Sequence, residues 1–175
     1  MDIGGGSTEF VTGARPGVAE RAISVQLGSV RQTERVGPSD PPSPEDLAAF
    51  ERDAVAAFEN VERTVPLSDA RTLVSCAGTA TTMLAVHLGL ERYDPDRIHR
   101  RWFAVEDAEE TLLHLACMTN AERAALPVMV PGRGDVIVAG GVILVTAMRR
   151  FGFERTLVSE TDILDGLAAE LLRIR

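Results

Sequence analysis

A run of three glycines near the start of the chain limits how its first residues can fold. The run lies in Asp2-Ile3-Gly4-Gly5-Gly6-Ser7-Thr8-Glu9, between two short segments with the character of β-strands. Glycine tolerates positive φ angles and lets another molecule approach the backbone closely. Successive N–H groups can also form a concave nest for an anion. The sequence therefore predicts a β-hairpin whose turn, from Gly4 to Ser7, binds phosphate.

Two carboxylates flank this turn. Asp2 ends the first strand, Glu9 lies on the second strand across the turn, and Ser7 adds a hydroxyl donor. Paired carboxylates beside a bound phosphate are suited to hold Mg²⁺ or to order an attacking water. The alternative is a plain hairpin with a loose glycine loop, but a two-residue turn would suffice for that. Two partly buried acids without partners would also be costly, so the phosphate and metal site is the favoured interpretation.

A second turn of small residues, Ala77-Gly78-Thr79-Ala80-Thr81-Thr82, follows a predicted strand and opens a predicted helix. Free N–H groups and the helix dipole attract anions at such a junction. An ordinary helix start, with Thr79 as the N-cap and Gly78 relaxing the turn, explains these residues equally well. Beside the first turn, however, two Gly/Thr turns after two strands have the pattern of two halves of one phosphate site.

Other candidate residues carry weaker signals. Arg133 lies in a glycine loop before an apolar segment and could steer a polyanion, whereas Asp135 is more simply the N-cap of the helix that follows. Glu160 and Asp162 are expected to help cap the last helix. The three histidines lie on different segments without the spacing of metal ligands: His87, His99 and His114.

The order of the predicted elements favours an α/β domain with a mixed sheet and helices on both of its faces. Three strands are expected first, followed by helices that alternate with single strands. The predicted strands cover 1–3, 7–12, 18–27, 71–77, 99–105 and 156–159. The predicted helices cover 45–63, 83–88, 106–118, 120–126, 135–151 and 163–173. The loop at 37–44 contains the two candidate caps of the first helix, Asp40 and Ser43, with Pro44 at its first position.

Composition excludes several classes of function. The 175 residues suit one domain, and a net charge of −8 argues against nucleic-acid binding over the whole surface. All 18 basic residues are Arg, which excludes a Walker-type phosphate loop and a Schiff-base lysine. Cys76 and Cys117 are expected to be small buried side chains. No apolar run reaches the ~18 residues of a membrane span and no signal peptide is recognisable, so a cytoplasmic protein is expected.

Several of these motifs together resemble the exopolyphosphatase and guanosine pentaphosphate phosphohydrolase family, within the sugar-kinase/actin/chaperone ATPase superfamily. The segment 2–10 is similar to the second phosphate motif of that family. The similarity continues through most of the chain, in the segments 77–82, 88–95, 118–123, 131–137 and 163–167. It implies a fold of two ribonuclease-H-like (actin-like ATPase) domains that face each other across a cleft, with this chain, 1–175, as the second domain.

The resemblance also implies roles for the residues already singled out. Asp2 and Glu9 would be catalytic, holding Mg²⁺ and ordering the attacking water. Gly4 to Ser7 would bind the phosphate under attack, and Gly78 with Thr79 matches a motif that contacts nucleotide in the ATPases. The family's first phosphate motif and catalytic glutamate, which belong to an N-terminal domain, match no part of this sequence. The chain alone is therefore expected to have little or no activity.

Three interpretations of function stay open on the sequence. The first is half of an enzyme that hydrolyses terminal phosphates of inorganic polyphosphate or of guanosine pentaphosphate. The second is a phosphate- or nucleotide-binding regulatory module, or a domain that forms a homodimer, without catalysis. The third is a nucleotide-binding member of the ATPase type that uses Gly78 and Thr79.

Overall fold

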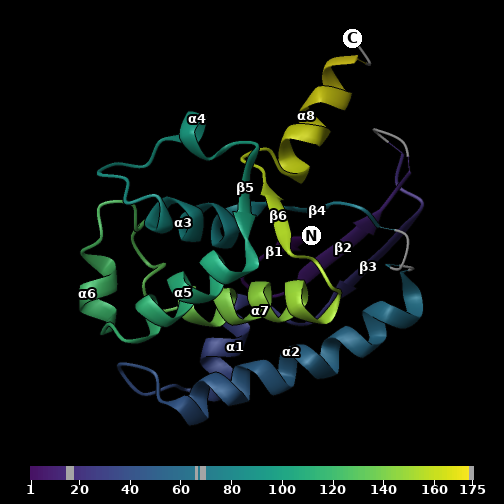
Figure 1. Ribbon diagram of the computed structural model, residues 1–175. Coiled ribbons are helices and arrows are strands. Elements are labelled where there is room, and N and C mark those ends of the chain that lie inside the picture. Colours follow the sequence, from purple (N-terminus) through teal and green to yellow (C-terminus); the bar gives the residue numbers. More distant parts are fainter. Residues whose placement is uncertain (15–17, 66, 68–69, 174–175) are drawn as a thin grey trace.

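Six strands join into one mixed sheet in the computed structural model, which describes residues 1–14, 18–65, 67 and 70–173. The first three are antiparallel neighbours, in the order β1 (Asp2–Ile3), β2 (Thr8–Thr12) and β3 (Arg21–Val25). The others lie in the order β4 (Leu73–Ser75), β6 (Arg155–Val158) and β5 (Arg101–Ala104), with β4 parallel and β5 antiparallel to β6. A parallel bridge between Asp2 and Cys76 joins the two groups into one sheet (Figure 1).

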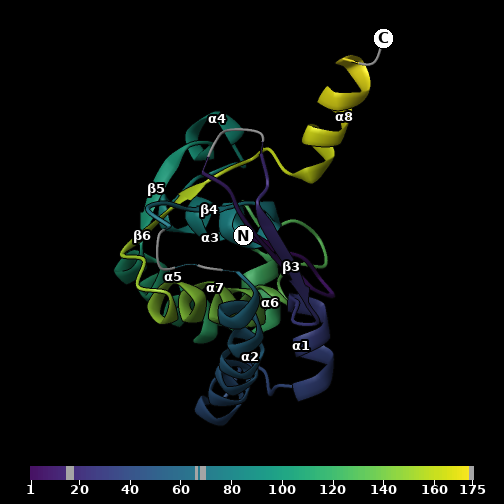
Figure 2. The same cartoon turned by 90° about the vertical axis from the view of Figure 1, so that its right-hand side faces the viewer.

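Helices surround this sheet unevenly. Their bounds are α1 (Ser29–Val36), α2 (Pro44–Thr64), α3 (Ala77–His87), α4 (Pro95–Ile98), α5 (Val105–Ala116), α6 (Asn120–Ala124), α7 (Ile137–Arg150) and α8 (Ile163–Arg173). α2 and α7 pack along each other, and α8 stands out at the opposite end of the molecule from α2 (Figures 1 and 2). Within the described residues, none of the helices combines the length and apolarity needed to cross a bilayer.

The alternation of side chains along the strands decides which face of the sheet is buried. In β2, Thr8 and Phe10 are buried whereas Val11 is 55% exposed, as period-two alternation requires. Val74 on β4 and Trp102 on β5 are exposed in the same way on the outer face. The predicted α/β class, the mixed sheet and its three antiparallel N-terminal strands are confirmed.

Aromatic and aliphatic side chains between the sheet, α2 and α7 form the core. Phe10, Phe58 and Phe151 meet there, with ring centroids 5.3–5.6 Å apart. Edge-to-face and tilted contacts at such distances are favourable beyond the burial of area. α7 contributes a nearly continuous buried surface because it is apolar on most sides.

α2 begins at a complete capping box. The Ser43 hydroxyl accepts the N–H of Asp46, and the Asp46 carboxylate accepts the N–H of Ser43. Hydrogen bonds from Ser43 and Ser39 lower the pKa of Asp46 to about 2. Of the two predicted caps, Ser43 is therefore confirmed, whereas Asp40 accepts the backbone N–H of Asn120 at 2.7 Å.

Several local predictions are wrong for identifiable reasons. Helix α1, at 29–36, was not predicted because its sequence is polar and short, with Ser29 and Gln32 as its buried residues. The predicted N-cap Asp135 lies before the helix, whose N-cap is Val136 with no side-chain bond. Cys76 is only half-buried and Cys117 is exposed, so neither thiol is a core residue.

Phe58→Ala is expected to lower the free energy of unfolding by about 3–5 kcal/mol, because it removes a fully buried ring and leaves a cavity. Urea denaturation followed by circular dichroism measures the change. Glu59→Ala, at the exposed neighbouring position, should change stability by no more than about 0.5 kcal/mol. Equal effects of the two substitutions would contradict the aromatic core.

Candidate functional site

The glycine hairpin closes as a tight turn with two central residues. The N–H of Gly4 donates to the carbonyl oxygen of Ser7 at 2.9 Å, so that Gly5 and Gly6 alone span the turn. Both are exposed. None of the three glycines has a positive φ angle. The expected use of left-handed backbone at this turn is therefore wrong.

The beginning of α1 holds the carbonyl groups of the turn from one side. The backbone N–H groups of Ser29 and Arg31 donate to the carbonyl oxygens of Gly4 and Gly5, each at 3.0 Å. The Arg31 side chain donates through Nε to the Gly6 carbonyl oxygen at 2.7 Å. In a planar trans peptide, C=O and N–H point in opposite directions. The N–H groups that follow these three carbonyls therefore point away from α1.

Those three N–H groups form a row on the open side of the turn. They belong to Gly5, Gly6 and Ser7, and they have no acceptor among the described residues. Unpaired backbone donors that converge on one side are the arrangement that binds a phosphate oxygen. The three donors are therefore free to bind an anion, although the turn lacks the positive φ angles expected from the sequence.

Close packing beneath the turn explains why glycine is needed there. A Cβ atom on Gly28 would lie 2.4 Å from the carbonyl oxygen of Gly5 and 2.6 Å from the carbonyl carbon of Gly6. A Cβ atom on Gly5 would lie 3.1 Å from Cγ2 of Val30. Protein interiors have little free space to absorb such overlaps. Gly28 is a site-forming residue that the sequence analysis missed, since α1 itself was not predicted.

Asp2 and Glu9 lie directly opposite each other on β1 and β2. Ser7 and Ser24 each donate a hydroxyl hydrogen bond to Oε1 of Glu9 at 2.6 Å, which fixes this carboxylate beside Asp2. Burial raises the pKa of Asp2, and the negative charge of Glu9 raises it further. The Ser7 hydroxyl, expected to bind phosphate, therefore positions Glu9 in this structure.

Asp162 is a third carboxylate near this pair. Its charge contributes to the raised pKa of Asp2, and its Oδ1 also accepts the N–H of Leu164 at 2.7 Å, in the predicted capping role. Glu160 does not share that role, because it accepts the hydroxyl of Tyr93 at 2.7 Å. The strand order could have predicted that Asp162 lies near Asp2, because loops that follow parallel strands meet at one edge of the sheet.

Two carboxylates form the part of the site that could hold a metal ion. Across 1–14, 18–65, 67 and 70–173, no cluster of three or more His, Cys, Asp or Glu side chains is arranged to bind one. Mg²⁺ commonly binds through one or two carboxylates and completes its shell with water and phosphate oxygens. Asp2 and Glu9 fit that requirement, and the repulsion that raises the pKa of Asp2 is of the kind that a cation relieves.

The second turn is the first turn of α3 and not a loop before it. α3 begins at Ala77, directly after its N-cap Cys76, so the alternative interpretation of Thr79 as the N-cap is wrong. Ala77 has a φ angle of 65°. Left-handed backbone costs a non-glycine residue about 1 kcal/mol or more, and such strain is common at functional sites.

Arg133 lies across the first turn of α3. Its Nη1 donates to the carbonyl oxygen of Gly78 at 3.2 Å and to Oγ1 of Thr82 at 2.7 Å. A Cβ atom on Gly78 would lie 2.2 Å from Nη2 of Arg133, so glycine gives the guanidinium room to approach. The structure therefore brings together Gly78 and Arg133, which the sequence placed in separate segments.

Thr79 is oriented toward the core. It is 6% exposed, and a Cβ atom on Gly140 of α7 would lie 2.7 Å from its Oγ1. The unpaired backbone N–H groups at the start of α3 are thus the part of this turn that could bind an anion.

The chain topology brings the two turns to one edge of the sheet. β1, β4 and β6 are parallel, and they lead into the glycine hairpin, the start of α3 and the segment that contains Asp162. The N–H of Cys76 also donates to the carbonyl oxygen of Met1 at 3.0 Å, which ties β4 to β1. Carboxyl ends of parallel strands are the usual place for a ligand site in such a sheet.

Comparison with known proteins agrees with this arrangement. Residues 1–173 match the family model described as the Ppx/GppA phosphatase family. The chain belongs to the Ppx/GppA phosphatase family. Exopolyphosphatase 2 of Mycobacterium tuberculosis is 42% identical over 175 residues, which cover 98% of this chain and 54% of that relative. A bifunctional 3-dehydroquinate synthase/phosphatase of Fusobacterium nucleatum is 33% identical over 97% of this chain and 25% of its own length.

Solved structures of Ppx/GppA relatives have the same fold. The crystal structure of an exopolyphosphatase-like protein matches with a TM-score of 0.92 and 33% identity, over 98% of this chain and 58% of that one. The PPX-GPPA enzyme of Aquifex aeolicus matches with a TM-score of 0.86 and 26% identity, over 97% and 55%. The predicted family and actin-like fold are confirmed, and the chain spans about half the length of these relatives.

Gly28→Ala is expected to lower the free energy of unfolding by about 1–3 kcal/mol, because the new Cβ atom overlaps the glycine turn. It should also weaken phosphate binding by displacing the row of N–H groups. Denaturation and isothermal calorimetry measure the two effects. Gly166→Ala is the matched control, since its Cβ atom would meet nothing within 4 Å. Gly28→Ala with unchanged stability would refute the contact.

Glu9→Gln is expected to lower the pKa of Asp2 toward its ordinary value of 3.8, because a neighbouring negative charge is removed. A raised folded-state pKa stabilises the protein below pH 3.8, and this contribution is lost as pH rises through the folded-state pKa. As the pH rises from 3.8 through the folded-state pKa of Asp2, Glu9→Gln should therefore lose less stability than the unsubstituted protein. NMR titration of the Asp2 carboxyl carbon tests this, with exposed Glu51→Gln as a control that leaves Asp2 unchanged.

Proposed function

We propose that this chain forms one wall of a phosphohydrolase site that removes terminal phosphate from inorganic polyphosphate or guanosine pentaphosphate with Mg²⁺. The observation that carries the proposal is the row of unpaired N–H groups at Gly5, Gly6 and Ser7 beside the paired carboxylates Asp2 and Glu9. Membership of the Ppx/GppA phosphatase family and the 42% identity to Exopolyphosphatase 2 support the choice of substrate class.

In this proposal the hairpin binds the phosphate group under attack. The N–H row meets the phosphate oxygens from one side, and its donors need no rearrangement because α1 already holds the carbonyl groups. Preorganised donors of this kind stabilise charge that develops during the reaction. The first turn of α3, with Gly78 and the N–H of Thr79, lies at the same edge and would bind a neighbouring phosphate. Arg133 would add positive charge there.

Asp2 and Glu9 would hold Mg²⁺ beside the hairpin. When bound, such an ion neutralises phosphate charge and makes a coordinated water more acidic. Ser7 and Ser24 orient the Glu9 carboxylate, and Asp2 lies directly opposite it on β1. Their contribution is to place the cation, and through it the water, within reach of the bound phosphate.

In this proposal the site lies at the outer face of the sheet, and this chain supplies the wall on one side of it. Phosphoryl transfer depends on positioning and charge stabilisation around the whole phosphoryl group. We propose that a companion domain, of the kind that makes up the remaining length of the relatives, supplies the opposite wall and the catalytic base. This chain by itself would then bind phosphate but turn it over slowly.

A phosphate-release assay with long-chain polyphosphate and Mg²⁺ tests whether the chain needs a companion domain for turnover. Turnover by the chain alone is expected to be at least about 100-fold below that of a full-length relative, since single catalytic donors already contribute that much. Turnover close to that of the relative would contradict the proposal.

Isothermal calorimetry with polyphosphate and Mg²⁺ tests the binding site itself. Gly5→Val should weaken binding strongly, because its Cβ atom would lie 3.1 Å from Cγ2 of Val30 and force the turn, with its N–H row, away from α1. Gly166→Ala should leave binding unchanged. Binding of polyphosphate that survives in Gly5→Val would refute the hairpin as the phosphate site. Binding of ATP alone would favour a nucleotide-binding module over a phosphohydrolase.

A further inference from the structure

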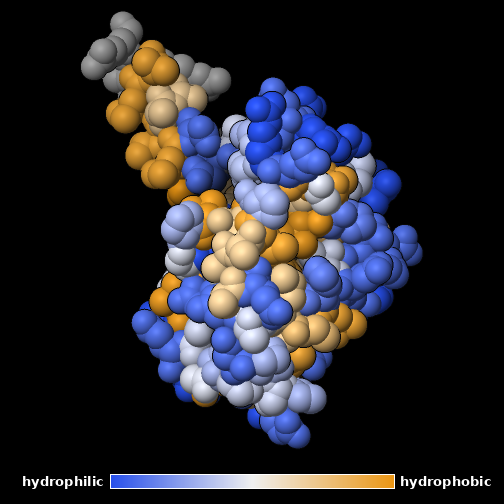
Figure 3. All heavy atoms as spheres, turned by 90° about the vertical axis from the view of Figure 1, so that its left-hand side faces the viewer, coloured by the Kyte–Doolittle hydropathy of each residue, from blue (hydrophilic) through white to orange (hydrophobic). Residues whose placement is uncertain are grey.

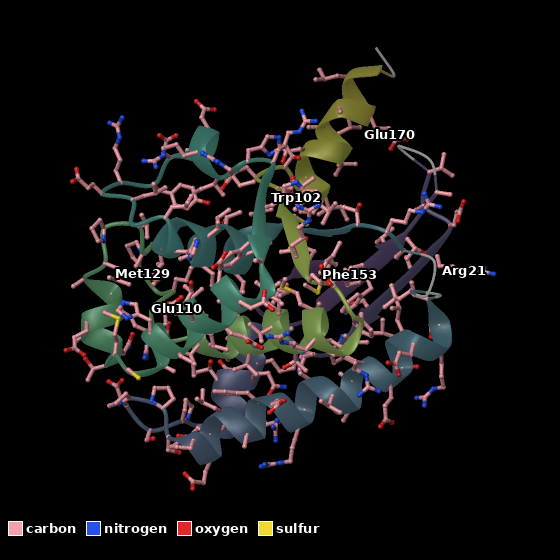
Figure 4. The ribbon with its side chains drawn as sticks, in the orientation of Figure 1. Arg21, Trp102, Glu110, Met129, Phe153 and Glu170 are labelled. Carbon is pink, nitrogen blue, oxygen red and sulfur yellow. The ribbon has the colours of Figure 1, made fainter. Side chains whose placement is uncertain are left out.

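Helix α7 supports both of the turns that the proposed site uses. It packs against α1, whose first residue, Ser29, donates its N–H to the carbonyl oxygen of Gly4 in the glycine hairpin. It also packs against α3, whose first turn carries the N–H groups of Gly78 and Thr79. α7 lies between α3 on one side and α1 on the other (Figures 1 and 4). The spacing of the two turns therefore depends on how closely α1 and α3 approach α7.

Both neighbouring helices approach α7 at Gly140. A Cβ atom on Gly140 would lie 2.7 Å from Oγ1 and 3.0 Å from Cγ2 of Thr79, and 3.3 Å from Cβ of Ser29. All three residues are buried. Non-bonded carbon atoms pack at about 3.5–4.0 Å, so an interior this close-packed has no room for a methyl group there. Glycine at this position lets the first residues of α1 and α3 rest on the same point of α7.

Rotation of the Thr79 side chain does not make room for a methyl group on Gly140. Two of the three staggered positions around Cβ of Thr79 face Gly140, one occupied by Oγ1 and the other by Cγ2. Rotation about χ1 exchanges the hydroxyl, the methyl and the hydrogen among these positions, so at least one heavy atom always faces α7. The Cβ atom of Ser29 is bonded directly to the backbone of α1. A methyl group on Gly140 therefore displaces the backbone of α1 or α3, and with it one of the two turns.

Gly141, the next residue of α7, has different surroundings. Its Cβ atom would lie 3.0 Å from Cδ1 of Leu112 and 3.0 Å from Sδ of Met83. These atoms end flexible side chains, which repack more easily than a backbone moves. Replacing either glycine by alanine changes helix propensity alike, and α8 projects from the body of the protein that contains α7 (Figure 3). Gly141→Ala is therefore a matched control that crowds the core without displacing the turns.

We propose that Gly140 is a positioning residue that sets the spacing of the two turns and thereby favours ligands with linked phosphate groups over a single phosphate. The inference rests on the proposed function, in which the glycine hairpin and the start of α3 bind neighbouring phosphates of one ligand. A linked ligand gains affinity from the second turn only where the spacing of the turns matches that of its phosphates. A single phosphate occupies one turn at a time, so its binding does not depend on the spacing.

Phosphate binding by Gly140→Ala and Gly141→Ala tests the spacing directly. Calorimetry gives the Kd of long-chain polyphosphate and NMR titration that of orthophosphate, both at one Mg²⁺ concentration. Gly140→Ala is expected to raise the Kd of polyphosphate at least about 10-fold and that of orthophosphate less than about 2-fold, because only the linked ligand uses both turns. Gly141→Ala should change neither. Equal weakening of both ligands in Gly140→Ala, or the same difference between ligands in Gly141→Ala, would overturn the proposal.

Deleting the atoms that meet the new methyl group tests whether the contact is the cause. Thr79→Ala removes Oγ1 and Cγ2 but keeps the backbone N–H of that residue. In a double-mutant cycle, Gly140→Ala is expected to weaken polyphosphate binding much less in the Thr79→Ala background than in the unsubstituted chain, since the overlap is relieved. The double variant should also be more stable than Gly140→Ala. An equal effect of Gly140→Ala in both backgrounds would overturn the proposal.

Amide chemical shifts and binding together separate this inference from the proposed function. Without ligand, Gly140→Ala should shift the amide resonances of Gly5 to Ser7 as well as those of Gly78 and Thr79, and Gly141→Ala should not. Polyphosphate binding that Gly140→Ala leaves intact would overturn the inference while the proposed function stands. An unsubstituted chain that binds neither polyphosphate nor orthophosphate would overturn the proposed function, and the inference with it.

Discussion

Backbone hydrogen bonds from the start of α1 to the glycine turn hold the geometry on which the candidate site depends. Each peptide unit is rigid, so fixing a carbonyl group on one side also fixes an N–H group on the other. Ser29 and Arg31 fix the carbonyl groups of the turn, and the N–H row results. Gly28 makes the contact possible because any side chain there would separate α1 from the hairpin. A polar helix of eight residues thus has more influence on the site than its length suggests.

The site combines features that are unfavourable for folding alone. Asp2 and Glu9 face each other across two strands, and burial together with mutual repulsion raises the pKa of Asp2. Ala77 adds left-handed backbone at the start of α3. Proteins keep such local costs where a ligand or partner uses them. A cation and a phosphate anion bound together would remove the repulsion and satisfy the unpaired N–H groups.

Stability and function are divided between the two sides of the sheet. One side packs against α2, α3 and α7 around the phenylalanine cluster and supplies a complete core. The other side carries the carboxylates, exposed Val11, Val74 and Trp102, and the departure of α8. Exposed apolar side chains that gather next to a polar site are typical of an interaction face. The buried core and the candidate site therefore lie on different sides of the sheet.

The sequence by itself determined the glycine hairpin, the paired acids, the α/β class and the family, because these follow from local patterns: three glycines, alternating strands and helical periodicity. It could not determine α1 or Gly28, since a short polar helix is stabilised by the hydrogen bonds and packing of its surroundings. The sequence also could not show that Asp162 lies near Asp2 or that Arg133 contacts Gly78. Those residues meet only because parallel strands bring distant loops to one edge. Tertiary structure alone decided that the large aliphatic side chains of α8 are exposed among the described residues, since burial depends on what lies opposite a helix and not on its own sequence.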